Sequence, residues 1–186
     1  MLRRSTAQGT RFLLGLLVGE LLASSLLAVV AYLVGTVVAF VAPLPLREVL
    51  TAVIVLGLGV ADLMNRTPHI WRQVPQGFVR TMPPGRLGLV WGFDLGLLFT
   101  TQKSTSLTWA ALAAVTLLLP STSWLVLGTM AVVGVVTVAI RSVNWSRRPL
   151  ARVGDRSRPW FAVMRRVAGV GLLALAVVTA VGALSW

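Results

Sequence analysis

The chain has 186 residues, of which 56% are hydrophobic and only 12% are charged. A soluble domain cannot enclose so much apolar surface in one core, so the composition excludes a soluble fold and predicts an integral membrane protein. The net charge of +12 would favour nucleic-acid binding in a soluble protein. Here the basic residues lie between apolar runs, where they orient helices, and we expect no nucleic-acid partner. The absence of cysteine excludes disulfides, thiolate metal sites and dithiol electron transfer.

Five apolar runs joined by short linkers are each long enough to cross a bilayer. They cover residues 12–42, 49–65, 87–118, 123–140 and 167–186. The first run exceeds a normal signal-peptide core and contains no clear cleavage site, so we expect it to remain as a helix. The sequence therefore predicts an all-α fold, a polytopic integral membrane helical bundle of about five transmembrane helices that forms a single domain over residues 1–186.

Arginine placement predicts how the helices are oriented. Arginines precede the first run, follow the second and crowd the segment from Arg141 to Arg166, whereas the other gaps hold only Arg47, offset by Glu48, and the uncharged "LPSTS". Arginine-rich loops stay on the cytoplasmic side. With five crossings in a cell membrane, the amino terminus is expected in the cytoplasm and the carboxyl terminus outside.

The first and third runs are too long for one upright crossing. Roughly 31 residues at 1.5 Å each span about 46 Å, so each helix must be tilted, broken or extended beyond the bilayer. A re-entrant third run would place the arginines from Arg141 to Arg166 outside, against the charge rule. We therefore predict a single third crossing that is interrupted near "TTQKST", where unwound or kinked backbone lines a cavity or packs in protein.

The chain also resembles itself at a spacing of about 74 residues. "GLLVGE" from Gly15 is similar to "GLVWGFD" from Gly88, and "GVADLMNR" is similar to "GVVTVAIR". Such matches also arise by chance in a chain rich in Gly, Val and Leu. A true duplication predicts parallel two-helix repeats over residues 12–75 and 87–149, followed by a final helix over 167–186. Gly15 with Gly19, and Gly88 with Gly92, form small-xxx-small faces that favour close packing within the chain over a dimer interface.

Glu20, Asp62, Asp94 and Lys103 are the ionisable residues well inside the runs, and each costs about 3 kcal/mol at the bilayer centre. The three carboxylates lie about 12, 6 and 10 Å from the cytoplasmic end of their runs, so they can share one layer in the inner half. For Asp62 we favour an interfacial pair with Arg66, four residues later. The Asp94 side chain could instead extend to the inner membrane interface, where Trp91 is an expected anchor. For Glu20, two interpretations stay open: a functional carboxylate and a structural ion pair.

Lys103 lies nine residues after Asp94, which places the two on opposite faces of an unbroken helix and about 13.5 Å apart. Either the helix breaks between them, or Lys103 faces a polar cavity among nearby hydroxyls; the alternative is a side chain that reaches the outer headgroups. The predicted substrate- or ion-binding residues are Glu20, Asp94, Thr100, Thr101, Gln102 and Lys103.

The stretch "GFDLGLLFTTQKSTSLTWAALA", residues 92–113, resembles the glycine-rich, helix-breaking segment of the CcdA/DsbD-type membrane thiol-redox transporter superfamily. That resemblance implies an interrupted helix around a central polar site. The family's cysteine and proline positions hold Thr, Gln and Lys here, so its electron transfer is not carried over. Its inverted three-helix halves also differ from two crossings per repeat.

The loop "NRTPHIWRQVPQGF" contains the single histidine, so no metal site and no cofactor are expected. His69, Arg72 and Arg80 are predicted to contact anionic lipid or a cytoplasmic partner. No paired nucleophile and base is apparent, so we expect no enzyme. The predicted function is a small transporter or transporter subunit that is not redox-active. The alternative is a noncatalytic membrane subunit or assembly factor, whose partners are membrane lipids and another membrane subunit.

Overall fold

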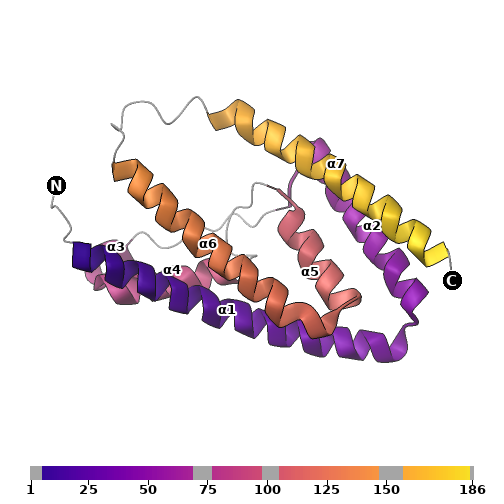
Figure 1. Ribbon diagram of the computed structural model, residues 1–186, viewed down its shortest axis with the longest axis horizontal. Helices are drawn as coiled ribbons and strands as arrows, with labels where there is room; N and C mark the ends of the chain where they lie inside the picture. The colour runs from indigo at the N-terminus through magenta and orange to yellow at the C-terminus, as the bar shows by residue number, and fades with distance from the viewer. Residues whose placement is uncertain (1–5, 69–76, 98–104, 147–156, 185–186) are drawn as a thin grey trace. The chain divides into compact units, whose positions relative to one another are not determined.

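A computed structural model describes residues 6–68, 77–97, 105–146 and 157–184, and all regular secondary structure in them is helical (Figure 1). The elements are α1 (Thr6–Val41), α2 (Leu44–Leu63), α3 (Phe78–Thr81), α4 (Pro84–Gly96), α5 (Leu107–Leu117), the 3₁₀ turn η1 (Pro120–Thr122), α6 (Ser123–Ser146) and α7 (Ser157–Leu184). The predicted all-α fold class is confirmed.

Four helical segments are long and apolar enough to cross a membrane. They are Ala7–Val41, Leu44–Leu63, Pro120–Ile140 and Trp160–Leu184, and the shorter apolar helix Leu107–Leu117 accompanies them. Large apolar side chains such as Phe40 of α1, Leu125 of α6 and Val178 of α7 are exposed to the surroundings. Exposed apolar surface on this scale is stable only in lipid, which confirms a membrane protein.

Prolines set several of the helix ends. No proline occurs within α1, and the helix stops at Val41, just before Pro43. Pro43 then caps α2, while α4 begins at Pro84. A proline suits the first turn of a helix because its missing N–H needs no partner there.

The two overlong runs fold differently. The first run forms the unbroken helix α1, whose 36 residues span about 54 Å. The third run is divided, because α4 ends at Gly96 and α5 begins at Leu107, with Leu97, Thr105 and Ser106 outside both helices. The predicted interruption of the third helix is therefore confirmed, and residues 98–104 lie outside the described part of the chain.

The segments expected to be linkers contain more helix than the apolar pattern predicts. The short helix α3 lies in one of them, α6 continues through Arg141 to Ser146, and α7 begins ten residues before the fifth apolar run. The expected linker boundaries were wrong here because arginine is a good helix former, so a change from apolar to basic residues does not end a helix.

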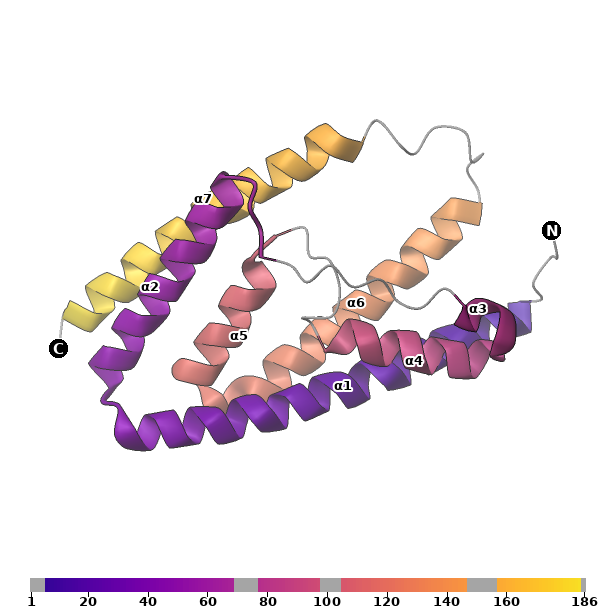
Figure 2. The same cartoon turned by 180° about the vertical axis from the view of Figure 1, so that it is seen from behind.

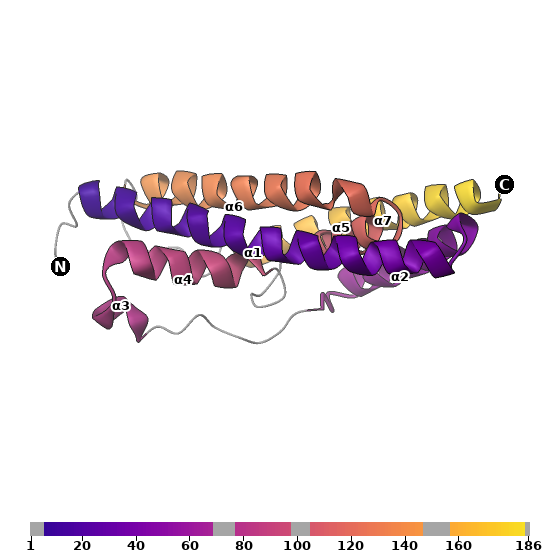
Figure 3. The ribbon, with the colours of Figure 1, turned by 90° about the horizontal axis from the view of Figure 1, so that it is seen from below.

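The chain packs as two compact units, which we describe separately. The first comprises Met1–Ala28, Ile70–Gln102 and Trp124–Pro149, and the second comprises Val29–His69, Lys103–Ser123 and Leu150–Trp186. In the first unit α4 lies alongside the N-terminal half of α1 (Figure 3). In the second unit α2 packs along α7 and also contacts α5 (Figure 2).

The core of the second unit joins these three helices. Val55 of α2, Ala110 of α5, and Leu172 and Ala176 of α7 are buried against one another, with Leu58 packed at their edge. Small alanines on two of the three helices leave room for the larger Val and Leu side chains.

Candidate functional site

Glycines bring α1 and α4 into backbone contact in the first unit. A Cβ atom on Gly19 would overlap the carbonyl oxygen of Leu89, and one on Gly88 would overlap the carbonyl oxygen of Phe12. Only glycine therefore fits at these positions. The prediction that the small-xxx-small faces allow close helix packing within the chain is confirmed. The two faces pack against each other.

The contacts across this crossing are reciprocal. A Cβ on Gly15 would lie 3.0 Å from the Leu89 nitrogen, and a Cβ on Gly88 would lie 2.9 Å from the Leu16 nitrogen. Gly88 follows Gly15, and Leu89 follows Leu16, by the same 73 positions. The two helices thus run parallel, with equivalent residues facing each other about a local twofold axis. This arrangement supports the internal repeat, which stays a prediction.

Glu20 and Asp94 lie at the same level of the crossing. Cβ atoms on Gly92 and Gly96 would lie 2.9 Å from the Glu20 nitrogen and 2.7 Å from the Glu20 oxygen, so the Glu20 backbone sits between these two glycines. Asp94 is midway between the same glycines in α4. Each acidic residue is only 8% exposed.

The two carboxylates leave the crossing on different sides. The Glu20 carboxylate lies against Gly134 of α6, where a Cβ atom would overlap Glu20 Oε1. Asp94 is two residues beyond Gly92, or about 200° around the helix, so it lies on the face of α4 away from α1. The structure therefore brings the two predicted residues to one level of the crossing, on different faces of their helices.

Trp91 has a neighbour that the sequence did not indicate. Its ring meets the Phe12 ring edge-on, with centroids 6.0 Å apart and an interplanar angle of 80°. Its indole Nε1 is buried. The ring expected to anchor the protein at the inner interface thus packs across the crossing of α1 and α4.

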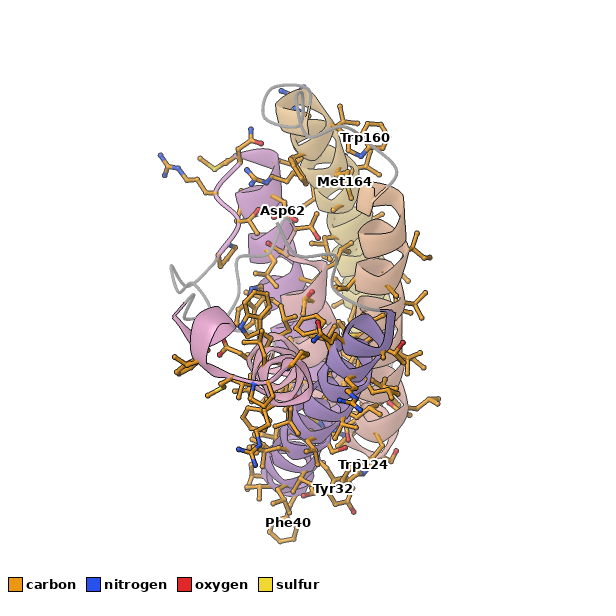
Figure 4. All side chains as sticks on the ribbon, turned by 90° about the vertical axis from the view of Figure 1, so that its left-hand side faces the viewer. Tyr32, Phe40, Asp62, Trp124, Trp160 and Met164 are labelled. Carbon is orange, nitrogen blue, oxygen red and sulfur yellow. The ribbon has the colours of Figure 1, made fainter. Side chains whose placement is uncertain are left out.

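Asp62 is the most completely enclosed acidic residue of the described chain, with 0% exposure, and it lies near the end of α2 (Figure 4). Its Oδ1 accepts hydrogen bonds from the hydroxyls of Thr67 and Ser106, both at 2.7 Å. Its Oδ2 accepts one from the backbone N–H of Ser106 at 2.7 Å. Both carboxylate oxygens therefore have hydrogen-bond donors, as buried polar atoms in proteins normally do.

The expected pair between Asp62 and Arg66 was wrong. Asn65 adopts a left-handed conformation with φ 56°. The N–H groups of Asn65 and Arg66 donate to the carbonyls of Asp62 and Ala61, at 3.0 and 2.7 Å, which is the Schellman arrangement at a helix end. Because of this turn, Arg66 is exposed. Thr67 then lies next to the Asp62 carboxylate and donates to it in place of Arg66.

Charged residues of α2 hold both ends of α5. The Asp62 carboxylate accepts a hydrogen bond from the N–H of Ser106, the residue that caps the start of α5. At the end of α5, the Leu117 carbonyl accepts a hydrogen bond of 3.1 Å from Arg47 Nη1. A negative charge at a helix start and a positive charge at its end both complement the helix dipole. Asp62 and Arg47 are about 22 Å apart along α2, whereas α5 is only about 16 Å long. Their side chains therefore lean toward each other along the helix axis to reach the two ends of α5.

A second glycine contact holds α2 against α7. A Cβ atom on Gly59 would lie 3.1 Å from the Gly169 oxygen, and one on Gly169 would lie 2.9 Å from Leu63 Cγ. Gly59 also contacts Leu172, whereas Leu63, one turn later in α2, contacts Gly169, about one turn earlier in α7. The two helices are therefore antiparallel. Asp62 thus belongs to a firmly packed helix pair.

The other predicted site residues are not described. Thr100, Thr101, Gln102, Lys103, His69 and Arg72 lie outside the described residues. Arg80 is on α3, and its side chain lies outside the described part as well. Among the residues that are described, no group of three or more His, Cys, Asp or Glu side chains can hold a metal ion.

The three residues that contact the Asp62 and Glu20 carboxylates, Ser106, Thr67 and Gly134, were not predicted. Ser106 had a signal, because a serine just before an apolar run is typical of a helix start. Thr67 and Gly134 had no such signal in the sequence, since their contacts depend on a turn and on the neighbouring helix.

No protein-family model matches the chain, and no curated protein or solved structure matches it either.

Proposed function

We propose that the chain is a small multi-pass transporter, or a transporter subunit, of the cell membrane. Its polar site comprises Glu20 and Asp94 together with Thr100, Thr101, Gln102 and Lys103, and it is neither an enzyme nor redox-active. The observation that carries this proposal is the burial of Glu20 and Asp94 at one level of the α1–α4 crossing.

Acidic residues within membrane helices are costly, and they persist mainly where they bind ions or protons. Asp62 does not belong to this site, because its two oxygens already accept hydrogen bonds that fix the start of α5. Glu20 and Asp94 are the two carboxylates that share one level of the α1–α4 crossing. A proton or a small inorganic cation is therefore the substrate class that suits two buried carboxylates.

The resemblance to CcdA/DsbD-type transporters enters the proposal in one respect. A helix that stops at Gly96 and resumes at Leu107 provides non-helical backbone within a membrane segment. Transporters use such interruptions to place polar groups around a substrate.

Transport is tested with the purified chain in liposomes that contain a pH-sensitive dye, under an imposed membrane potential. We expect proton or cation flux that Glu20→Gln and Asp94→Asn each reduce about tenfold or more, with Glu48→Gln as the matched acidic control. Absence of flux, together with copurification of larger subunits and poor stability of the chain alone, would instead support the noncatalytic subunit or assembly factor.

The proposed orientation places the amino terminus in the cytoplasm and the carboxyl terminus outside. Reporters fused after Trp186 test it. Activity only from a reporter that works in the cytoplasm would reject the five-crossing topology.

A further inference from the structure

An apolar groove lies between α2 and α5 in the second unit. Its volume is about 510 Å³, and its lining includes Ile54 and Leu58 of α2 and Trp109, Leu112, Ala113 and Thr116 of α5. That volume falls within the range of small-molecule sites in proteins. In a membrane helix pair, an empty groove leaves its lining atoms without van der Waals partners, so an apolar occupant stabilises it.

The two ends of the groove differ chemically. At one end, which Trp109 and Pro68 line, the Trp109 indole donates to the Pro68 carbonyl at 3.1 Å, a contact between neutral groups. At the other end Leu117 lines the groove, and its carbonyl accepts from Arg47 Nη1. A positive charge therefore lies directly at the second of these ends.

Arg47 retains hydrogen-bonding capacity. A guanidinium carries five N–H donors, and within the described chain one of them is assigned, to the Leu117 carbonyl. The Nε atom is buried and has no hydrogen-bond partner among the described residues. A headgroup does not reach this enclosed atom, but Nη2 also has no hydrogen-bond partner among the described residues and is not enclosed. Phosphate oxygens accept strongly from such guanidinium donors.

The dimensions favour a lipid. Arg47 lies in the first turn of α2, at the end of a segment able to span the membrane, where phosphate headgroups are found. The groove follows α5, which is about 16 Å long. That length is about half of the ~30 Å hydrocarbon core, the depth that belongs to one leaflet.

We propose that this groove binds a membrane phospholipid, with one acyl chain against α2 and α5 and the phosphodiester at Arg47. Glu48 is the next residue, and its Oε2 is also buried without a hydrogen-bond partner in the described chain. A carboxylate next to Arg47 lowers the net positive charge at this end of the groove, which disfavours headgroups that carry several phosphates. The site therefore suits a headgroup with a single phosphodiester, such as phosphatidylethanolamine or phosphatidylglycerol. This inference is independent of the proposed transport site.

The direct test uses the unaltered chain in vesicles of phosphatidylethanolamine and phosphatidylglycerol that carry a photoreactive group in the acyl chain. We expect crosslinks to concentrate on Leu112, Ala113 and Thr116. Labelling spread evenly over exposed positions such as Val178 would overturn the proposal, and so would crosslinking of a second copy of the chain at the groove.

Variants separate the two parts of the site. Ala113→Phe fills the groove and is expected to remove most of the crosslinking, whereas Val178→Phe, on an exposed face of α7, leaves it unchanged. Arg47→Gln is expected to weaken phospholipid retention in native mass spectrometry about tenfold, through loss of a charge-assisted contact. Unchanged retention in both Ala113→Phe and Arg47→Gln would contradict the proposal.

Discussion

The first and third apolar runs have similar lengths and opposite structures. The first forms α1 without a break, although it contains serine and threonine, and the third divides into α4 and α5. Hydroxyls in α1 bond back to their own helix, since Ser24 Oγ donates to the Leu21 carbonyl and Thr36 Oγ1 donates to the Leu33 carbonyl. The Ser106 hydroxyl and N–H instead donate to Asp62 of another helix.

This difference shows that a membrane helix can begin within an apolar run when another helix satisfies its first donors. The initial N–H groups of a helix have no partner inside that helix, and unsatisfied donors are costly in lipid. Asp62 supplies the acceptor for α5, and Arg47 supplies a donor at the other end. An excess of polar residues does not by itself interrupt a helix.

Removal of Asp62 is expected to have the largest effect on this contrast. Asp62→Ala leaves the Ser106 N–H and two hydroxyls buried without their acceptor, so the free energy of unfolding should fall by about 3–5 kcal/mol. Reversible unfolding in detergent measures the loss. Arg66→Ala is the control, and little change is expected in it. An equal loss of stability in Arg66→Ala would support an ion pair between Asp62 and Arg66 and contradict the contacts described here.

Widening the α1–α4 crossing should have the next largest effect. Gly92→Val places a side chain where the Leu16 carbonyl lies, and it should cost about 2–3 kcal/mol because both backbones must separate. Gly57→Val is the matched control, since a Cβ there meets nothing within 4 Å. Equal stability of the two variants would refute the close glycine crossing.

Ser106→Ala tests the hydroxyl part of the α5 start alone. It removes one of the three hydrogen bonds to Asp62 and keeps the backbone N–H, so a loss of about 1–2 kcal/mol is expected. Combined with Asp62→Ala it should add little, because both changes remove the same contact. Full additivity in the double variant would mean that the two residues act separately.

Arg47→Gln should have the smallest effect on unfolding, about 1 kcal/mol, because it weakens a single contact at the end of α5. Amide hydrogen exchange should rise in the last turn of α5 and stay unchanged at Ala110, near the Asp62 end. Faster exchange at Ala110 alone would show that Arg47 does not hold the Leu117 end.

Much of the fold follows from the sequence because membrane helices are encoded locally. Apolar run length predicts the spanning helices, and the spacing of Gly15, Gly19, Gly88 and Gly92 predicts their close packing. The partner of Asp62 was not predictable in this way. Ser106 is 44 residues distant, whereas Arg66 satisfies the local four-residue rule, and the left-handed Asn65 that directs Arg66 outward is visible only in the folded chain.

The level shared by Glu20 and Asp94 was predictable in part. Counting residues from the ends of the apolar runs places them within a few ångströms of each other, as the crossing does. Their different directions were not, because the contact of Glu20 with Gly134 depends on how α6 packs. Binding by the residues of the interruption stays a prediction.

The most direct test of the central claim is a solid-state NMR distance measurement in lipid bilayers between the Ser106 amide nitrogen and the Asp62 carboxylate carbon. An interrupted third helix held by Asp62 predicts strong dipolar coupling, as expected for a hydrogen bond with 2.7 Å between the nitrogen and Oδ2. No detectable coupling, together with helical hydrogen bonding continuous from Leu87 to Leu118, would contradict it.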